Sequence, residues 1–147
     1  MSIISKTVKA LTISQPYASL IAYGEKFVEN RRWETNYRGL LLIHAGKGTQ
    51  HMDLDEMRED NLPAGAVVAV ARLSACLMLV RILQERNRVG NVGSHTWREL
   101  ADHEHTEGPW CWVLDSVMRL PTPVPCKGAQ GLWAPSEELL AAVNAQI

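Results

Sequence analysis

Short apolar runs, separated by glycine, proline and polar residues, recur along most of this 147-residue chain. Runs of this length and pattern predict β-strands. The clearest of them are 8–13, 27–32, 39–45 and 110–120. The longer run 66–80 alternates poorly, so we expect one long strand or two strands with a bend near Ser74, and a helix in its second half is the alternative. Three prolines keep 121–125 extended and favour an edge position.

Helical spacing of apolar residues predicts a few short helices. These are 15–23, 51–60, 96–105 and 137–144. We expect Ser14 to cap the first helix, Pro16 to lie in its first turn and Gly24 to end it in the left-handed conformation. The polar segment 84–94 is predicted to be a loop. This order, rich in strands and poor in helix, favours a mainly β fold with some α (α+β): a small, mostly antiparallel barrel with helices outside.

The composition fits one globular domain that has no overall attraction for nucleic acid. Apolar residues make up 46% of the chain and the net charge is −1, so no general basic field is present. The charge is unevenly spread, however. The segment 81–98 contains four arginines and a single acidic residue, Glu85. Acidic residues are concentrated at 53–60 and 99–107. A locally positive surface on a neutral protein is therefore compatible with the sequence.

The cysteines and the apolar runs bear on location. Three cysteines lie far apart without a C-x-x-C motif: Cys76, Cys111 and Cys126. This pattern favours reduced, mostly buried thiols and hence a cytoplasmic protein. We identify no signal-peptide pattern. The longest apolar run, 64–83, is interrupted by Arg72 and Arg81, so a buried strand is expected there and no membrane partner.

The strongest candidate site is the charged segment that follows Gly24. Because side chains alternate along a strand, Glu29 and Arg31 share one face at a spacing of roughly 6.6 Å. Lys26 follows the turn and is placed to join them. Phe27 has the same parity and is expected at the rim of this face. Val28 points the other way, into the core.

These residues carry a resemblance to a known family. The spacing Gly24-x-Lys26-x-x-Glu29-x-Arg31 resembles the G-x-K-x-x-E-x-R signature of ASCH domains, which belong to the PUA-like superfamily. The flanking segments 11–20 and 37–47 and the tail 121–133 are similar to the same family. The likeness extends from about residue 8 to 135. It implies a PUA-like small mixed β-barrel of five or six strands with short peripheral helices, and we expect a single ASCH domain over 1–147.

The charged residues are suited to recognition of a nucleotide. Arg31 offers a planar fork for phosphate or a base edge, Lys26 a point charge, and Glu29 an acceptor for N–H donors. We therefore predict binding of RNA or a modified nucleotide in a positively charged cleft. The plainer alternative is a surface salt-bridge cluster of little energetic consequence. Two nearby cations make ligand binding an easier role for Glu29 than general-base catalysis, and Lys26 would serve as a base only if desolvated.

Further residues are candidates for the same cleft. They are Gln15, Trp33, His44, Lys127 and Gln130, with Tyr17 as a second stacking ring. Each has a structural alternative: a lone histidine in an apolar strand is more often a hydrogen-bonded core residue, and tryptophan in a small barrel is core first. The glutamines are as well suited to backbone support as to ligand contact.

The resemblance also leaves other functions open. Some ASCH-like proteins are amidohydrolases of acylated cytidine with a threonine nucleophile, but Glu29 stands at that position here; Thr12 and Ser14 are the nearest substitutes. Others bind or cleave RNA, and cleavage needs only a base, an acid and a cation, which Lys26, Glu29 and Arg31 with His44 supply. A small hydrolase, either a ribonuclease or a nucleoside amidohydrolase with Lys26, Glu29 and Arg31 as catalytic residues, is thus the alternative. A protein-interaction module, as in transcriptional coactivators with this domain, is the third.

A metal site is not expected. The polar cluster 102–105 and His95 contain three histidines, but the spacing of His103 and His105 is poor for ligation from a helix and no thiolate is near. A polar helix end explains them better. We predict no metal and no cofactor, with RNA or a nucleoside or nucleotide as partner and a protein partner as the alternative.

Overall fold

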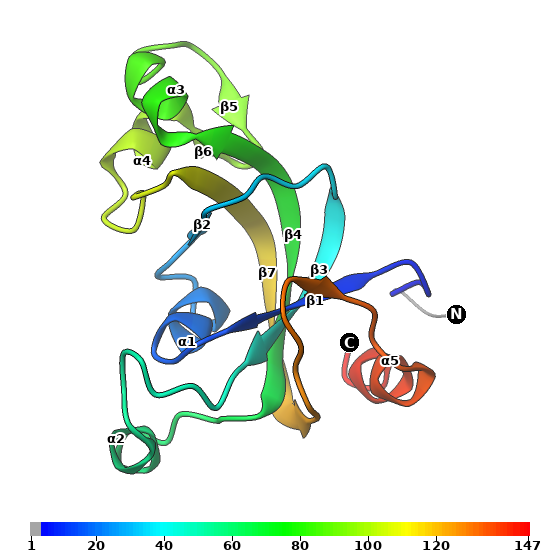
Figure 1. Ribbon diagram of the computed structural model, residues 1–147. Coiled ribbons are helices and arrows are strands. Elements are labelled where there is room, and N and C mark those ends of the chain that lie inside the picture. Colours follow the sequence, from blue (N-terminus) through cyan, green and yellow to red (C-terminus); the bar gives the residue numbers. More distant parts are fainter. Residues whose placement is uncertain (1–3) are drawn as a thin grey trace. The chain divides into compact units, whose positions relative to one another are not determined.

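The computed structural model describes residues 4–147 and has an α+β fold (Figure 1). One mixed sheet has the hydrogen-bonded order β2-β7-β4-β3-β1-β8, and β5 pairs with β6 in a separate ribbon. The strands are β1 (Lys9–Ile13), β2 (Val28–Arg31), β3 (Gly39–Ala45), β4 (Ala66–Met78), β5 (Asn91–Val92), β6 (His95–Thr96), β7 (Trp110–Pro125) and β8 (Leu132–Trp133). The helices are α1 (Tyr17–Ala22), α2 (Leu54–Glu59), α3 (Leu79–Gln84), α4 (Trp97–Asp102) and α5 (Glu137–Asn144). The predicted fold class, with a sheet of five or six strands and short helices, is confirmed.

The chain divides into two compact units. Unit 1 comprises the segment up to Glu25, Leu40–Ala71 and Val117–Ile147. Unit 2 comprises Lys26–Gly39 and Arg72–Ser116. That the whole of 1–147 forms one ASCH domain stays a prediction.

Unit 1 is built on a parallel pair of strands. β1 runs parallel to β3, with Leu11 opposite Ile43, and β8 adds to β1 in the antiparallel direction. Ser136 caps α5, which buries Leu139, Leu140 and Val143 in the core of this unit. The N-terminal segment lies beside α5 (Figure 1), where the Ile4 amide donates to Asn144 Oδ1 at 3.0 Å. An apolar helix face and two apolar strands thus exclude water from one continuous core.

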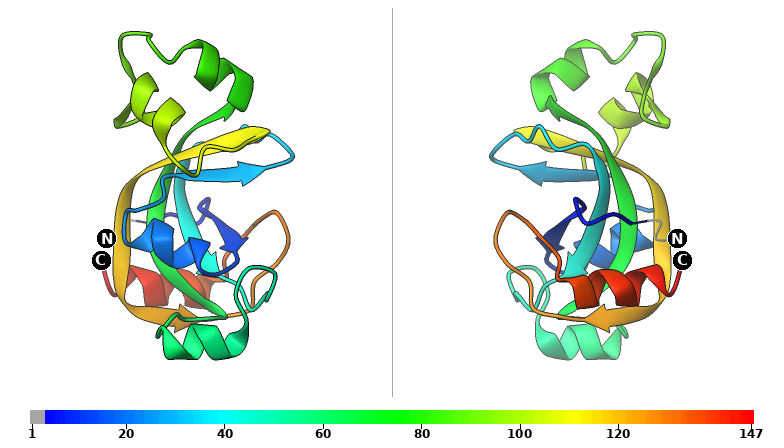
Figure 2. Two further views of the ribbon diagram at one scale, coloured as in Figure 1. Left: turned by 90° about the vertical axis from the view of Figure 1, so that its left-hand side faces the viewer. Right: turned by 90° about the vertical axis from the view of Figure 1, so that its right-hand side faces the viewer.

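Unit 2 has its own core. β2 pairs antiparallel with the first part of β7, and Val28 and Val113 lie opposite each other among the buried residues. Helices α3 and α4 and the β5–β6 ribbon gather in one group (Figure 2), packing Ile82 and Leu100 inward. Thr96 and Glu99 form a capping box that starts α4.

Several expectations about single elements are confirmed. The bounds of β3 and α5 agree with the predicted 39–45 and 137–144. Gly24 has a φ of +80° and follows α1, as a left-handed terminating residue should. The proline-containing segment 121–125 is extended and forms the end of β7.

Other expectations were wrong. Ser14 does not cap α1: the cap position is occupied by Pro16 without a side-chain bond, and Ser14 contributes its carbonyl, which accepts from the Ala18 amide at 3.2 Å. For the run 66–80, by contrast, the expectation of one long strand is confirmed: β4 continues through Ser74, and helix begins at Leu79. The expected loop 84–94 contains β5.

Among residues 4–147, no helix is both long and apolar enough to cross a membrane.

Candidate functional site

Three charged side chains predicted to act together are joined in unit 2. The Glu29 carboxylate lies between two cations: Oε1 is 3.5 Å from Lys26 Nζ, and Oε2 is 2.8 Å from Arg31 Nη2. Arg31 Nε also donates to Oε2, at 3.0 Å. We call Lys26, Glu29 and Arg31 the charged cluster.

The local sequence explains this arrangement. Gly24 ends α1, and β2 starts three residues after Glu25, at Val28. Alternation along β2 then places Glu29 and Arg31 on one face and Val28, fully buried, on the other. Antiparallel pairing with β7 sets Glu29 opposite the buried Trp112.

The charged cluster is buried, unlike an ordinary surface salt bridge. The side chains of Lys26, Glu29 and Arg31 are 4%, 11% and 22% exposed. Burial lowers the pKa of Lys26, although the carboxylates of Glu29 and Glu107 act in the opposite direction. Lys26 is therefore desolvated, as a lysine that acts as a general base must be. Arg31 is the member of the cluster most accessible to a ligand.

Phe27 is stacked between two imidazole rings. Ring centroids lie 3.9 Å from His95 and 3.8 Å from His103. The Phe27 amide donates to His103 Nε2 at 3.2 Å, so the neutral ring carries its proton on Nδ1. Burial, assisted by the nearby charges of His105 and Lys26, lowers the pKa of His103 to about 4. Phe27 is half-buried, and the two histidines on which it stacks belong to the same unit.

Asn30, on the opposite face of β2 from Glu29 and Arg31, anchors a turn. Its Nδ2 donates to the His105 carbonyl at 2.7 Å. Its Oδ1 accepts from the amides of Glu107 at 3.0 Å and Gly108 at 2.8 Å. One side chain thus satisfies three backbone groups of the segment 105–108.

Trp33 is the aromatic candidate of unit 2. It is 40% exposed and meets Trp112 edge to face, with ring centroids 4.7 Å apart. Trp112 Nε1 donates to the Trp33 carbonyl at 3.2 Å. Trp33 therefore has a fixed backbone and an accessible ring, as a stacking platform requires.

His44, a candidate in unit 1, is a buried and hydrogen-bonded histidine. Nε2 donates to the Cys126 carbonyl at 2.9 Å, and Nδ1 lies 3.2 Å from Thr12 Oγ1. Thr12 Oγ1 also accepts from Trp133 Nε1 at 3.1 Å. Burial lowers the pKa of His44, despite the opposing bond to Cys126. This geometry agrees with the core alternative weighed for His44.

The other candidates of unit 1 differ in accessibility. Gln15 is fully buried: Nε2 donates to Ser19 Oγ and to the Pro63 carbonyl, each at 2.8 Å, while Oε1 accepts from the Ser19 amide at 3.0 Å. It therefore supports the backbone around α1. Lys127 and Gln130 are exposed. Tyr17 packs edge to face on His51 at 5.0 Å.

The eight predicted ligand residues thus divide equally between the units. Lys26, Glu29, Arg31 and Trp33 lie in unit 2, and Gln15, His44, Lys127 and Gln130 lie in unit 1. Direct bonds join the three members of the charged cluster. The assignment of the remaining residues to a common site stays a prediction.

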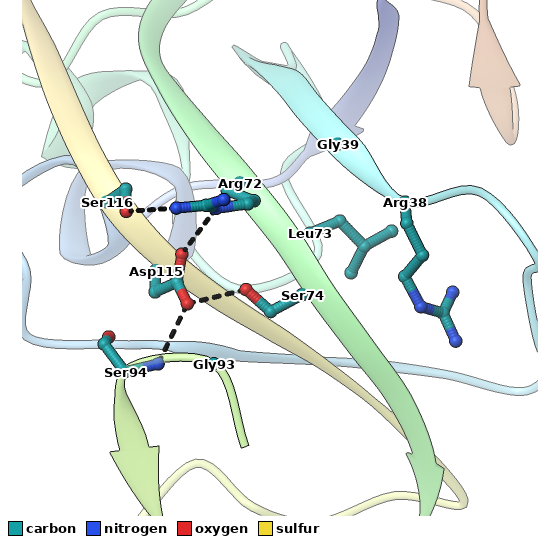
Figure 3. Close-up of a pocket in the computed structure, with 9 residues that line it drawn as sticks. All are labelled: Arg38, Gly39, Arg72, Leu73, Ser74, Gly93, Ser94, Asp115 and Ser116. Atoms are coloured by element: carbon teal, nitrogen blue, oxygen red, sulfur yellow. Dashed lines mark hydrogen bonds and ion pairs between the residues drawn. The ribbon is translucent and has the colours of Figure 1, made fainter. Parts of the chain in front are cut away.

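Sequence reasoning missed a second polar site in unit 2, centred on Asp115 (Figure 3). This buried carboxylate accepts from Ser74 Oγ at 2.6 Å, the Ser94 amide at 3.0 Å and Arg72 Nε at 3.2 Å. Burial alone would raise the pKa of Asp115, but these hydrogen bonds outweigh it and lower the pKa. The site borders an open pocket of about 650 Å³. One signal was available: Arg72 and Asp115 are isolated opposite charges within two apolar strand segments.

Within residues 4–147, no group of three or more His, Cys, Asp or Glu side chains is arranged to hold a metal ion. His103 and His105 do lie close, with ring centroids 5.4 Å apart, but His103 Nε2 already accepts from the Phe27 amide. The cysteines are free, and Cys76 and Cys111 are buried.

The comparisons with known proteins identify the family of this chain. The ASCH domain model matches residues 11–114, and the chain belongs to the ASCH domain family. Solved structures with a similar fold include the ASCH protein of Zymomonas mobilis and two point mutants of it. The unmutated protein has a TM-score of 0.58 and 16% identity, over 97% of this chain and 99% of that one. The tyrosine-to-phenylalanine mutant has a TM-score of 0.58 and 17% identity, over 96% of this chain and 98% of that one.

The serine-to-alanine mutant gives the same TM-score of 0.58 and 17% identity, over 97% of this chain and 98% of that one. No curated protein matches the chain. The predicted membership of the ASCH family, with its PUA-like fold, is confirmed.

Proposed function

We propose that this ASCH protein binds RNA or a modified nucleotide through the charged cluster of Lys26, Glu29 and Arg31. The observation that carries the proposal is the rigid pairing of one carboxylate with two cations in a buried setting. Side chains fixed in this way lose little conformational entropy when a ligand binds.

Each member has a separate role. Arg31, the most accessible, takes a phosphate or carbonyl oxygen with its guanidinium fork. Glu29 accepts from a base amine or a sugar hydroxyl. Lys26, the most deeply buried of the three, adds a positive charge. Trp33 is proposed to stack a base, and Gln15, His44, Lys127 and Gln130 stay proposed contacts from unit 1.

Hydrolysis is the second candidate, because Lys26 is desolvated. A lysine whose pKa is lowered by burial exchanges a proton nearer neutral pH, as a general base or acid must. In this role Lys26 would move the proton, Glu29 would orient Lys26, and Arg31 would stabilise the developing negative charge. Suitable substrates are RNA, whose own 2′-hydroxyl attacks, or acylated nucleosides.

The test compares binding with turnover. The protein is incubated with labelled single-stranded RNA and with a panel of acylated nucleosides, beside the variants Lys26→Met, Glu29→Gln and Arg31→Gln. The matched control is Lys6→Ala, whose side chain is 85% exposed and pairs with Glu137 on the surface. Circular dichroism confirms that each variant is folded.

Binding without turnover, weakened in Lys26→Met and Arg31→Gln but not in Lys6→Ala, supports recognition. Binding to RNA should weaken by about 0.7 logarithmic unit for each tenfold increase in salt and each phosphate contacted, whereas the affinity for a neutral nucleoside should change little. Turnover that Lys26→Met abolishes selects the hydrolase. If neither ligand binds, both nucleotide proposals fail, and a protein partner becomes the alternative to pursue.

We further propose a cytoplasmic location. The three free thiols support it, since reduced cysteines are typical of that compartment.

A further inference from the structure

Three arginines of unit 2 surround a small hollow beside α3 and α4. The hollow measures about 310 Å³, and its arginines are Arg86, Arg88 and Arg98. Its other lining residues are neutral, including Asn87, Asn91 and Thr96, and none is acidic. These arginines belong to the basic segment that the sequence singled out and that the charged cluster does not use.

Neighbouring side chains hold the guanidinium groups in place. Asp102 accepts from Arg86 Nε at 2.8 Å and from Arg86 Nη2 at 3.0 Å. Asn87 Oδ1 accepts from Arg98 Nη2 at 2.6 Å. The three arginines are thus oriented by partners that leave part of each guanidinium toward solvent.

Arg88 is held in two ways. Its Nη1 lies 3.6 Å from Glu85 Oε2, and its guanidinium carbon lies 5.7 Å from the centre of the Trp97 ring. Glu85 and Asp102 neutralise part of the positive charge, but both lie outside the lining of the hollow. A ligand entering the hollow therefore meets arginine, amide and hydroxyl groups and the Val89 side chain, but no carboxylate among the lining residues.

The chemistry of these groups selects a phosphate. Guanidinium forks match the oxygens of phosphate with paired hydrogen bonds, and several arginines around one point favour phosphate over a single carboxylate. We propose that this hollow binds a backbone phosphate of an RNA strand. The choice of RNA as the source rests on the proposed function, since the charged cluster would bind the same kind of ligand.

The test is a salt titration of a 12-nucleotide single-stranded RNA, followed by fluorescence anisotropy. Arg88→Gln and Arg98→Gln are compared with the wild type, and Arg86 is left intact because Asp102 depends on it. Arg58→Gln is the matched control: Arg58 is 76% exposed and pairs with Asp55 on α2. Thermal melts establish that all variants are folded.

We expect each hollow variant to weaken binding at low salt by about three- to tenfold and to reduce the salt slope by about 0.7, the loss of one phosphate contact. Arg58→Gln should leave both quantities unchanged. Unchanged affinity and slope in Arg88→Gln and Arg98→Gln would overturn the inference, even if Lys26→Met shows that RNA binds at the charged cluster.

Two further ligands distinguish the source of the phosphate. Inorganic phosphate and polyglutamate are titrated while the arginine Nε–H signals are followed by NMR. The Arg88 and Arg98 signals could shift with phosphate although Arg88→Gln and Arg98→Gln leave RNA binding unchanged. That result would mark a site for free phosphate and refute the RNA assignment. A response to polyglutamate alone would refute the phosphate site and indicate an acidic protein. If the wild type binds no RNA but responds to phosphate, the RNA assignment of the proposed function fails while the phosphate site stands.

Discussion

Arg31 binds a single carboxylate oxygen of Glu29 through two of its nitrogens, Nε at 3.0 Å and Nη2 at 2.8 Å. The other carboxylate oxygen is left to face Lys26. Glu29 therefore divides its two oxygens between two cations, and both ion pairs of the charged cluster depend on it.

This dependence predicts unequal effects on stability. Glu29→Gln leaves two buried cations without their carboxylate, which should lower the free energy of unfolding by about 3 kcal/mol. Lys26→Met removes a desolvated cation and keeps the Glu29–Arg31 pair, so a clearly smaller loss is expected. Urea denaturation at pH 7 measures both. Equal losses would contradict the central role of Glu29.

His103 should make the protein sensitive to mild acid. Its pKa of about 4 in the folded state lies below the unfolded value of about 6.5, so the unfolded chain binds more protons between these values. The free energy of unfolding is therefore expected to fall as the pH drops from about 6.5 to about 4. His103→Gln should reduce this slope in urea titrations, and the lowered pKa of His44 should maintain the part that is left.

The control for this prediction is His51→Gln. His51 is exposed and lies in unit 1, so its replacement should leave the acid sensitivity intact. A slope that persists undiminished in His103→Gln would assign the effect to another group.

Asp115 should stabilise unit 2 only while it is ionised. Its pKa is lowered in the folded state, so its contribution is present above the unfolded value of about 3.9 and is lost as the pH falls through the folded pKa. Asp115→Asn is expected to destabilise at pH 7, and the difference from wild type should shrink at pH 3. Amide exchange at Ser94, which donates to the carboxylate, should accelerate in the variant.

The exposed Asp55→Asn provides the comparison, since Asp55 is 84% exposed on α2. A difference between Asp115→Asn and wild type that stays constant from pH 7 to pH 3 would mean that the charge of Asp115 is irrelevant.

Gly128 should not tolerate a methyl group. A Cβ at this position would lie 2.7 Å from His44 Cε1 and would also clash with Thr12 Oγ1. Gly128→Ala is expected to destabilise by about 1–3 kcal/mol through overpacking and to shift the His44 signals in NMR spectra. Gly48→Ala, where a Cβ meets nothing within 4 Å, should be close to neutral. Equal melting temperatures of the two variants would contradict this account.

Much of the fold could be predicted from local pattern alone. The apolar run of β3 and the amphipathic spacing of α5 have clear chemical boundaries: Gly39 and Gly46 flank the first, and Ser136 caps the second. The end of β4 has no such chemical boundary in the sequence. Leu77 and Leu79 are equally apolar, and only packing in unit 2 places strand at one and helix at the other.

The candidate site was predictable to the extent that it is local in sequence. Lys26, Glu29 and Arg31 lie within six residues, so strand alternation alone brings them together. The partners of Asp115 come from β4 and from the β5–β6 ribbon, and no short motif links them. Burial of the charged cluster could not be predicted from the sequence either, because exposure depends on the elements packed around β2. The same holds for His103, which reaches the Phe27 amide across 76 residues.

Asn30 fixes the strand of the charged cluster to a neighbouring turn. Glu29 and Arg31 share β2 with the side chain that holds the turn 105–108 through three hydrogen bonds. We expect amide exchange at Glu107 and Gly108 to report any displacement of β2 when a ligand binds, because both amides donate to Asn30 on that strand.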